Sequence, residues 1–472
     1  MNQTVKPNVV IIGLDCLAPE LLFHRWLDQL PTFADLMTSG TWGPLMSVDP
    51  PITIPAWSCM MSGYNPAQLG LYGFRHRRLG SYDDRYLAFS TEVKKPRAWD
   101  HLNERGLSSG LLGVPQTYPP KPINGYMVSG FLAPSNESIY TYPDPIRDEI
   151  EDLVGDYRLD VENFRSNDKE RIKNEIHEMT CQRFEIFEHL IKTRPTDFAM
   201  MVEIGPDRMH HAFWRYCDPD HRLYEKDNPF QNVILDYYKL LDDKIKHLLD
   251  TLDPNTHVFI VSDHGAQPMQ GGFCINDWLR KQGLLTLKKQ PETQTRFDES
   301  MVDWAATKAW AWGGYYARIF INLQGREPQG RVLPERYEAL MEEISSKLQI
   351  VSRENETTTM GNKVFRPSDM TKDQMANGDY PDLMLYPGNL GYRAIGSVGN
   401  PGIFVEQNDT GPDDANHAKE GVFIYRGPAS RQIKDSGPRE DLRLVDIGPT
   451  VLRLFDINPP ADAVGRPMYL SL

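Results

Sequence analysis

The chain has 472 residues, 40% hydrophobic and 25% charged, which is enough to bury a large core in one elaborated domain or in two. Its formal net charge is −14, and an acidic chain is poorly suited to general binding of nucleic-acid polymers or anionic membranes. A small anionic ligand held through metal ions is compatible with this charge.

The N-terminal segment lacks the apolar core of a signal peptide, and no run of about 18 apolar residues marks a transmembrane helix. The five cysteines are odd in number, scattered and free of any CxxC motif. We therefore expect reduced thiols in a cytoplasmic protein without a membrane span. The cysteines are Cys16, Cys59, Cys181, Cys217 and Cys274.

The first predicted element is a buried parallel strand over residues 9–14, because this run is continuously apolar. Asp15 follows it, and an amphipathic helix interrupted by Pro31 is predicted over 19–37, with Gly40 as its stop signal. An Asp directly after a first strand either caps the next helix or serves as a ligand.

A threonine then lies at a second predicted helix start. Pro55 fits the first turn of a helix that continues through Met61. Thr53 lies just before that turn, where outward-pointing backbone N–H groups favour anions. It is either a helix cap or a nucleophile whose alkoxide is stabilised by metal and by the helix N-terminus.

A basic cluster at 74–78, which includes Arg75 and Arg77, stands out in this acidic chain. It is either a solvated loop or a clamp for substrate phosphate. Helix and strand alternate over 96–134, and the segment 143–193 is charged and helical.

A buried strand predicted over 198–203 leads directly to two candidate ligands. Asp207 and His211 are four residues apart, so a helical turn places both on one face, a usual spacing for two ligands to one metal. His210 points elsewhere and is interpreted as a supporting or surface histidine.

An amphipathic helix over 229–251 delivers the chain to another buried strand at 258–261. That strand ends in Asp263 and His264, followed by a glycine. Open α/β sheets place their active sites at the carboxyl ends of such strands.

Residues 291–390 are more polar, with several tryptophans and tyrosines and a helix at 334–347. We interpret them as a lid-like insertion, and the aromatic residues as packing rather than a base-stacking platform. The catalytic core is then predicted to comprise 1–290 and 391–472. His417 precedes a late strand in the second part of this core.

These elements predict an α/β protein, a three-layer α/β/α sandwich with a largely parallel central sheet. Its strand ends and adjacent loops offer oxygen and nitrogen ligands without a thiolate among them. Such a set suits two divalent ions, Zn²⁺ or Mn²⁺, which about 4 Å apart can hold the attacking and leaving oxygens of a phosphoryl transfer. The candidates are Asp15, Thr53, Asp207, His211, Asp263, His264 and His417.

The order of these motifs resembles the type I phosphodiesterase/nucleotide pyrophosphatase family of the alkaline phosphatase superfamily, in its bacterial and archaeal cytosolic branch. The segments LPTFADLMTSGTWGPL, VPQTYPPKPINGYMVSGFLAP, INDWLRKQGLL and DIGPTVLRLFDI support the resemblance. It covers most of 9–134, 198–290 and 380–472. The motifs are the Asp15 strand end, Thr53-x-Pro55, Asp207-x-x-x-His211, Ser262-Asp263-His264-Gly265 and the late His417.

The resemblance implies two ion positions and a covalent mechanism. One ion is held by Asp207, His211 and His417, and the other by Asp15, Thr53, Asp263 and His264. Thr53 takes the phosphoryl group, and water then releases it. The extracellular members carry an Asn after the nucleophile's Pro, whereas Ala56-Trp57 stands here, which leaves nucleotide preference open.

We therefore predict a metal-dependent phosphohydrolase of phosphodiesterase/nucleotide pyrophosphatase type, which acts on a small phosphorylated substrate through a phospho-threonine intermediate. Substrate identity and oligomeric state are open, and the alternatives are a phosphomonoesterase or phosphomutase of the same superfamily and a catalytically silent metal-binding protein. A sulfatase of the formylglycine type needs Cys or Ser where Thr53 stands, and phosphoglycerate mutase relatives use Ser. We expect Arg75 or Arg77 to contact substrate oxygens, because the candidate site otherwise lacks a cationic side chain.

Overall fold

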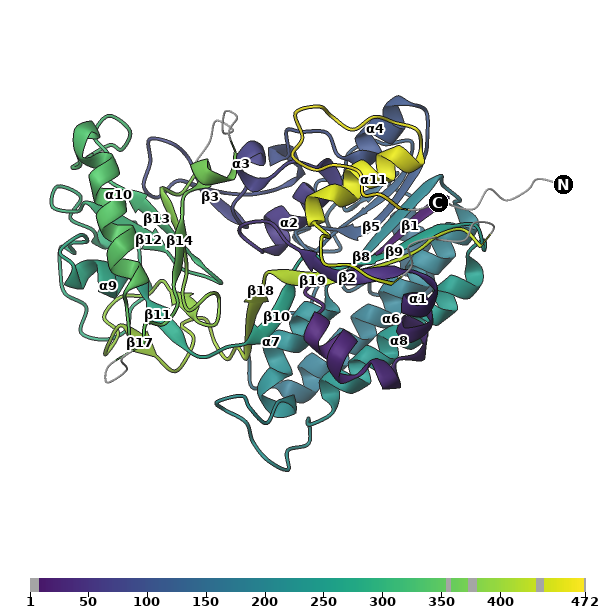
Figure 1. Ribbon diagram of the computed structural model, residues 1–472, viewed down its shortest axis with the longest axis horizontal. Coiled ribbons are helices and arrows are strands. Elements are labelled where there is room, and N and C mark those ends of the chain that lie inside the picture. The colour runs from purple at the N-terminus through teal and green to yellow at the C-terminus, as the bar shows by residue number, and fades with distance from the viewer. Residues whose placement is uncertain (1–7, 354–357, 372–379, 430–436, 471–472) are drawn as a thin grey trace.

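The computed structural model describes residues 8–353, 358–371, 380–429 and 437–470. Within them the largest element is a nine-stranded sheet with the order β20-β2-β19-β9-β1-β8-β5-β6-β7 (Figure 1). The strands are β1 (Val9–Leu14), β2 (Thr41–Met46), β5 (Ser109–Val114), β6 (Gly125–Ser129), β7 (Thr141–Tyr142), β8 (Phe198–Glu203), β9 (His257–Val261), β19 (Glu420–Arg426) and β20 (Gly437–Pro438).

β1 lies in the interior of this sheet, between two strands that run parallel to it. Val9 is in register with Phe198 of β8 and with His257 of β9. Every residue of β1 and β8 is buried, as expected for continuous apolar runs covered on both faces. β5 and β6 extend the parallel part, whereas β19 and β7 run antiparallel to their neighbours.

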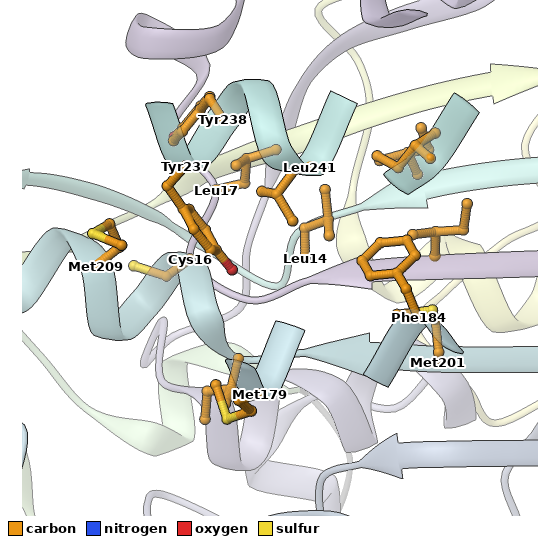
Figure 2. Packing of buried hydrophobic residues seen from close by; sticks show 14 of the residues in the cluster. Leu14, Cys16, Leu17, Met179, Phe184, Met201, Met209, Tyr237, Tyr238 and Leu241 are labelled. Atoms are coloured by element: carbon orange, nitrogen blue, oxygen red, sulfur yellow. The ribbon is translucent and has the colours of Figure 1, made fainter. Parts of the chain in front are cut away.

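Helices cover both faces of the sheet, which gives the predicted three-layer arrangement (Figure 1). One face carries α1 (Pro31–Ser39), α6 (Lys169–Thr193), α7 (Gly205–Cys217) and α8 (Val233–Thr251). The other carries α2 (Thr53–Ser62), α4 (Ala98–Glu104) and α11 (Ile447–Leu454). Figure 2 shows Leu14 of β1, Met201 of β8 and Leu241 of α8 in the core on the first face. The predicted α/β fold class is confirmed.

The segment after β1 is less regular than the predicted helix over 19–37. A π-helical turn at Glu20–Arg25 and a 3₁₀ turn at Leu27–Gln29 come first, and α1 begins only at Pro31. Proline has no N–H to donate and cannot continue the preceding turn, but it fits the first position of a new helix.

A second lobe, the described part of residues 272–405, lies beside the large sheet (Figure 1). A four-stranded antiparallel sheet forms its centre, in the order β12-β13-β15-β14. A smaller sheet, β16-β11-β17, adjoins it. The elements are β11 (Gly272–Cys274), α9 (Ile275–Lys281), β12 (Ala309–Trp312), β13 (Ala317–Ile321), α10 (Pro334–Gln349), β14 (Lys363–Phe365), β15 (Leu383–Tyr386), β16 (Arg393–Ile395) and β17 (Phe404–Val405).

This lobe has a hydrophobic core of its own. Trp304 stacks on Tyr82 with ring centroids 3.6 Å apart, and Trp310 is fully buried beside them. These aromatic residues pack the lobe, as the sequence suggested. The same core also includes Phe273 and Val398, which lie outside 291–390, and the boundaries of the inserted subdomain stay a prediction.

Several further helices and strands complete the structure. β10 and β18 form an antiparallel pair, β3 pairs with β4, and α5 packs on α6. All five cysteines are free thiols. Over the described ranges, no helix combines the length and apolarity that a membrane span requires. These elements are α3 (Pro66–Leu69), β3 (Arg75–Arg77), β4 (Arg85–Leu87), α5 (Ile146–Val154), β10 (Gly265–Pro268) and β18 (Ala415–Ala418).

Candidate active site and metal centre

Three adjacent parallel strands deliver the candidate ligands to one edge of the sheet. β1 leads directly to Asp15, and β9 leads to Asp263 and His264. β8 leads into α7, which carries Asp207 and His211 on consecutive turns. Because the carboxyl ends of parallel neighbours meet at the same edge, these side chains converge.

His417 reaches the same edge by a different route. It lies on β18, opposite Ala266 of β10, which directly follows the Asp263–His264 pair. β18 then turns into β19, the antiparallel neighbour of β9. All seven predicted residues are buried, with at most 3% of any one exposed: Asp15, Thr53, Asp207, His211, Asp263, His264 and His417.

Asp207, His211 and His417 form the first group of ligand atoms. Oδ1 of Asp207 is 3.3 Å from Nε2 of His211 and 3.5 Å from Nε2 of His417. All three ligand atoms lie within 4.8 Å of one another. Ligand atoms about 2.0–2.2 Å from one Zn²⁺ are separated by no more than about 4.4 Å, so this group needs only small adjustments to share an ion.

The second group gathers around Asp15. Nε2 of His264 is 3.2 Å from Oδ2 of Asp263 and 3.9 Å from Oδ1 of Asp15. The Thr53 hydroxyl donates to the same Oδ1 of Asp15 over 3.4 Å. Trp57 donates its Nε1–H to the other Asp15 oxygen at 2.8 Å.

The structure decides between the alternatives for Asp15 and Thr53 as helix caps. The residues directly before the two elements Glu20–Arg25 and Thr53–Ser62 are Pro19 and Ile52, and neither element has a side-chain cap at its start. Ile54 has non-helical angles, φ −110° and ψ 107°, so the regular part of α2 begins at Pro55. The Thr53 side chain is directed to the carboxylate cluster instead.

The three histidines are oriented so that their Nε2 atoms face the cluster. Nδ1 of His417 donates to the Pro51 carbonyl at 2.8 Å, and Nδ1 of His264 to the Gly265 carbonyl at 3.2 Å. Nδ1 of His211 donates to a carboxylate oxygen of Asp413 at 2.6 Å. A neutral imidazole that donates through Nδ1 carries its lone pair on Nε2, the arrangement found in metal-binding histidines.

Four buried atoms of this site have no hydrogen-bond partner among the described residues. They are Nε2 of His211, His264 and His417 and Oδ2 of Asp263. Leaving such an atom unpaired away from water is costly, whereas coordination to a cation satisfies it. The donor set and its unpaired atoms therefore fit divalent metal ions.

Burial and mutual repulsion strongly shift the pKa values of the acidic groups. Burial, and then the charge of Asp207, raises the pKa of Asp15 well above its usual value, and burial followed by Asp15 does the same for Asp263. Burial alone would raise the pKa of Asp207, but His211 and Arg208 hold it well below its usual value. A divalent cation would relieve the repulsion among these carboxylates.

The three histidines differ in the direction in which their pKa values are shifted. Burial, followed by the neighbouring His417, holds the pKa of His264 well below its usual value, and burial also lowers the pKa of His417. Both are thus kept neutral, as metal ligands must be. Burial would lower the pKa of His211 as well, but Asp413 and then Tyr315 and Asp207 raise it.

Sequence reasoning missed the residues that support these ligands. Asp413 also accepts from Nε of Arg165 at 2.7 Å and from Arg393 of β16 at 3.2 Å. Tyr315 of the second lobe stacks on His417 with centroids 3.8 Å apart, and its hydroxyl accepts from Arg165 at 2.6 Å. The only feature of the sequence that pointed to Asp413 was the stretch of polar residues that precedes His417.

Arg75 and Arg77 of the basic cluster both contact the second lobe. Arg77 is only 2% exposed, and its guanidinium pairs with Glu327 over 3.0 Å and lies over the Trp310 ring in the second lobe. Arg75 is exposed, and its backbone carbonyl accepts from Arg318. The expectation that the site otherwise lacks a cationic side chain was wrong, because Arg208 pairs with Asp207 itself.

His210 is buried rather than on the surface. Its Nε2 lies 3.0 Å from the Tyr238 hydroxyl, and burial lowers its pKa to about 3. Of the two interpretations from the sequence, the supporting role behind α7 fits this position, and the surface one does not.

Solved structures with the same fold come from animal relatives. Human ectonucleotide pyrophosphatase/phosphodiesterase 5 superposes with a TM-score of 0.57 at 14% identity, covering 98% of this chain and 98% of that one. The murine protein, as an inactive Thr-to-Ala variant in complex with AMP, gives 0.57 at 12% identity over 99% and 98% of the two chains. These likenesses describe the fold. A search of curated proteins found no match.

The model of one protein family matches residues 9–417, from the start of β1 to the last candidate ligand. That range contains every strand end and every ligand of the site. The resemblance drawn from the motifs is thereby confirmed: the chain belongs to the type I phosphodiesterase/nucleotide pyrophosphatase family and is a hydrolase of the phosphodiesterase/pyrophosphatase type.

Proposed function

We propose that the protein is a two-metal phosphohydrolase that cleaves small phosphate esters or pyrophosphates through a phospho-threonine intermediate on Thr53. One observation carries the proposal. The Thr53 hydroxyl lies on Asp15, inside a buried cluster whose histidine Nε2 atoms are otherwise unpaired among the described residues.

We divide the ligands between the two ions as the family resemblance implies. Asp207, His211 and His417 would hold one ion, and Asp15, Asp263 and His264 would hold the other beside Thr53. Zn²⁺ and Mn²⁺ both suit imidazole and carboxylate donors. When bound, such ions supply Lewis-acid stabilisation to the oxygens of a phosphoryl group.

The chain's own residues define the covalent step. Oγ1 of Thr53 attacks phosphorus, the bond from phosphorus to the leaving-group oxygen breaks, and that oxygen departs with the rest of the substrate. The hydroxyl proton is directed at Oδ1 of Asp15 before attack. Water then attacks the same phosphorus, the Thr53 oxygen leaves, and phosphate or a phosphate monoester is released.

Several features support hydrolysis on a small substrate. The whole site is buried, which favours a compact substrate over a polymer. The murine relative loses activity when a threonine is replaced by alanine, and it binds AMP. Arg75 stays a candidate for substrate contact because it is exposed, whereas Arg77 already has Glu327 as its partner.

The test combines substrate screening with chemical trapping. Metal-loaded protein is assayed on aryl phosphate monoesters, diesters, nucleotides and sugar nucleotides, with Zn²⁺ and Mn²⁺ in separate series. Rapid acid quench during turnover, followed by peptide mass spectrometry, should find phosphate on Thr53. A diester preference separates the proposal from a phosphomonoesterase, and transfer to a second substrate hydroxyl would identify a phosphomutase.

Substitutions make the test sharper. Thr53→Ala should lower kcat/KM by several orders of magnitude, as loss of a covalent nucleophile does, and Thr53→Ser should retain part of the activity. Ser58→Ala is a matched control, since this buried hydroxyl lies further along α2 and is not among the ligands. Near-normal turnover by Thr53→Ala on every active substrate would contradict the covalent mechanism.

A further inference from the structure

Cys16 directly follows Asp15, and its thiol lies within the candidate metal centre. Its backbone adopts a φ of 64°, which is uncommon for a residue other than glycine. In this conformation the Cys16 N–H donates to Oδ1 of Asp263 at 3.2 Å, and the thiol donates to the Gly265 carbonyl at 3.3 Å. No part of Cys16 is exposed.

The sulfur lies among ligand atoms of both ion positions. Sγ of Cys16 and the ligand atoms of His264 and His417 all lie within 4.8 Å of one another. His417 belongs to the first group and His264 to the second. Their Nε2 atoms are buried without a hydrogen-bond partner in the described part of the chain, which points to a ligand at this place rather than to apolar packing alone.

The other four cysteines differ from Cys16 in their position relative to the candidate ligands. All of them lie in the described ranges, and none belongs to a group of candidate ligands found there. Cys59 is as deeply buried as Cys16 but packs into the core on the opposite face of the sheet. Burial of a small thiol therefore does not by itself bring a cysteine to the ligands.

We propose that Sγ of Cys16 is a metal ligand at the boundary between the two ion positions, which adds a sulfur donor to the oxygen and nitrogen set. On metal binding the thiol loses its proton to water and its hydrogen bond to Gly265, and a sulfur–metal bond forms without any oxidant. A sulfur donor favours Zn²⁺ over Mn²⁺, so Cys16 selects the metal. This inference rests on the proposed two-metal site.

The geometry is compatible with this assignment. Zn–S bonds are about 2.3 Å and Zn–N bonds about 2.0–2.1 Å, so a sulfur and a nitrogen on one ion lie no more than about 4.4 Å apart. The three atoms approach that limit already in the metal-free arrangement. A rotation of the Cys16 side chain away from the Gly265 carbonyl supplies the remaining adjustment.

Cobalt substitution provides a direct readout that is independent of activity. The full-length protein is stripped with a chelator and reloaded with Co²⁺, and its near-ultraviolet spectrum is recorded at two bound ions per chain. A sulfur-to-cobalt charge-transfer band is expected in the wild-type protein and in Cys59→Ala, and it should be absent from Cys16→Ala. Persistence of the band in Cys16→Ala would overturn the proposal.

X-ray absorption on the wild-type zinc protein needs no variant and covers the case in which Cys16→Ala does not fold. A sulfur shell at about 2.3 Å supports the proposal, and a shell of only nitrogen and oxygen at about 2.0–2.1 Å overturns it. These outcomes distinguish a failure of the Cys16 proposal from a failure of the proposed metal-dependent function. Two tightly bound ions without sulfur refute the Cys16 ligand alone, whereas a protein that binds no divalent ion refutes the metal-dependent function as well.

Discussion

Asp413 holds the imidazole of His211, and replacing it tests whether that contact supports metal binding. Its carboxylate serves three donors: Nδ1 of His211 at 2.6 Å, Nε of Arg165 at 2.7 Å and a guanidinium N–H of Arg393 at 3.2 Å. In Asp413→Asn one acceptor oxygen becomes an NH₂ group, so at least one donor faces another donor. The shape of the side chain is nearly unchanged.

The expected magnitude follows from this geometry. Removing a carboxylate that orients a ligating histidine costs about 10–100-fold in metal affinity, which is about 1.4–2.7 kcal/mol. The loss should fall on the ion held by Asp207, His211 and His417. The ion beside Asp15 should keep its affinity within a few-fold, because the Asp413 carboxylate bonds to His211, Arg165 and Arg393 rather than to that group.

Competition with a chromogenic chelator measures both zinc affinities, and elemental analysis after dialysis gives the stoichiometry. Asp414→Asn is the matched control, because Asp414 is the adjacent buried carboxylate and accepts from Arg215 at 2.6 Å. Its link to His211 runs through the backbone, where its N–H donates to the His211 carbonyl at 2.9 Å, and this survives the substitution. The reasoning fails if Asp413→Asn binds both ions within twofold of wild type, or if Asp414→Asn weakens them equally.

Chelation of the bound ions should abolish activity and lower the Tm, because the buried carboxylates Asp15 and Asp263 then repel each other without a cation. Adding Zn²⁺ should restore both the activity and the Tm, and an unchanged Tm after chelation would argue against a resident metal. Arg77→Ala should destabilise the protein by about 1–3 kcal/mol in urea unfolding, since Oε2 of the buried Glu327 loses its donor while Oε1 keeps Arg326 at 2.9 Å, and an unchanged free energy of unfolding would contradict this. Arg75→Ala should raise KM if this exposed side chain meets substrate oxygens, and identical kinetics would make it an ordinary surface residue. Burial lowers the pKa of His221 to about 4, so its charged form is disfavoured in the folded state. The stability that neutral His221 supports is complete above about pH 6.5 and is lost as the pH drops towards 4. Metal-free His221→Gln should therefore lose less stability than wild type over that interval, and equal slopes would refute the assignment.

Local patterns in the sequence predicted the central strands and the candidate ligands at their ends. The continuous apolar runs at 9–14 and 198–203 became β1 and β8, because a strand buried on both faces must be apolar throughout. The spacing of Asp207 and His211 fixed their shared face, because both belong to one helix.

The supporting contacts could not be read from the sequence in the same way. His211 and Asp413 are 202 residues apart, and Arg77 and Glu327 are 250 apart. No periodicity or spacing relates such positions, since both pairs join segments that only the folded chain brings together. The basic cluster suggested phosphate binding. In the folded chain, however, Arg77 pairs with Glu327 and packs on Trp310, which both belong to the second lobe.

The sequence by itself determined which side chains end the central strands and therefore which atoms can meet at the carboxyl edge of the sheet. That information is local, because apolar runs, helical spacing and strand ends each involve neighbouring residues. Only the tertiary structure decided which groups accompany those ligands: Asp413 bonds to His211, Trp57 bonds to Asp15, and the Cys16 thiol lies within 4.8 Å of ligand atoms of His264 and His417. These contacts join segments that are distant in the sequence, and the relative positions of such segments depend on how the entire chain packs.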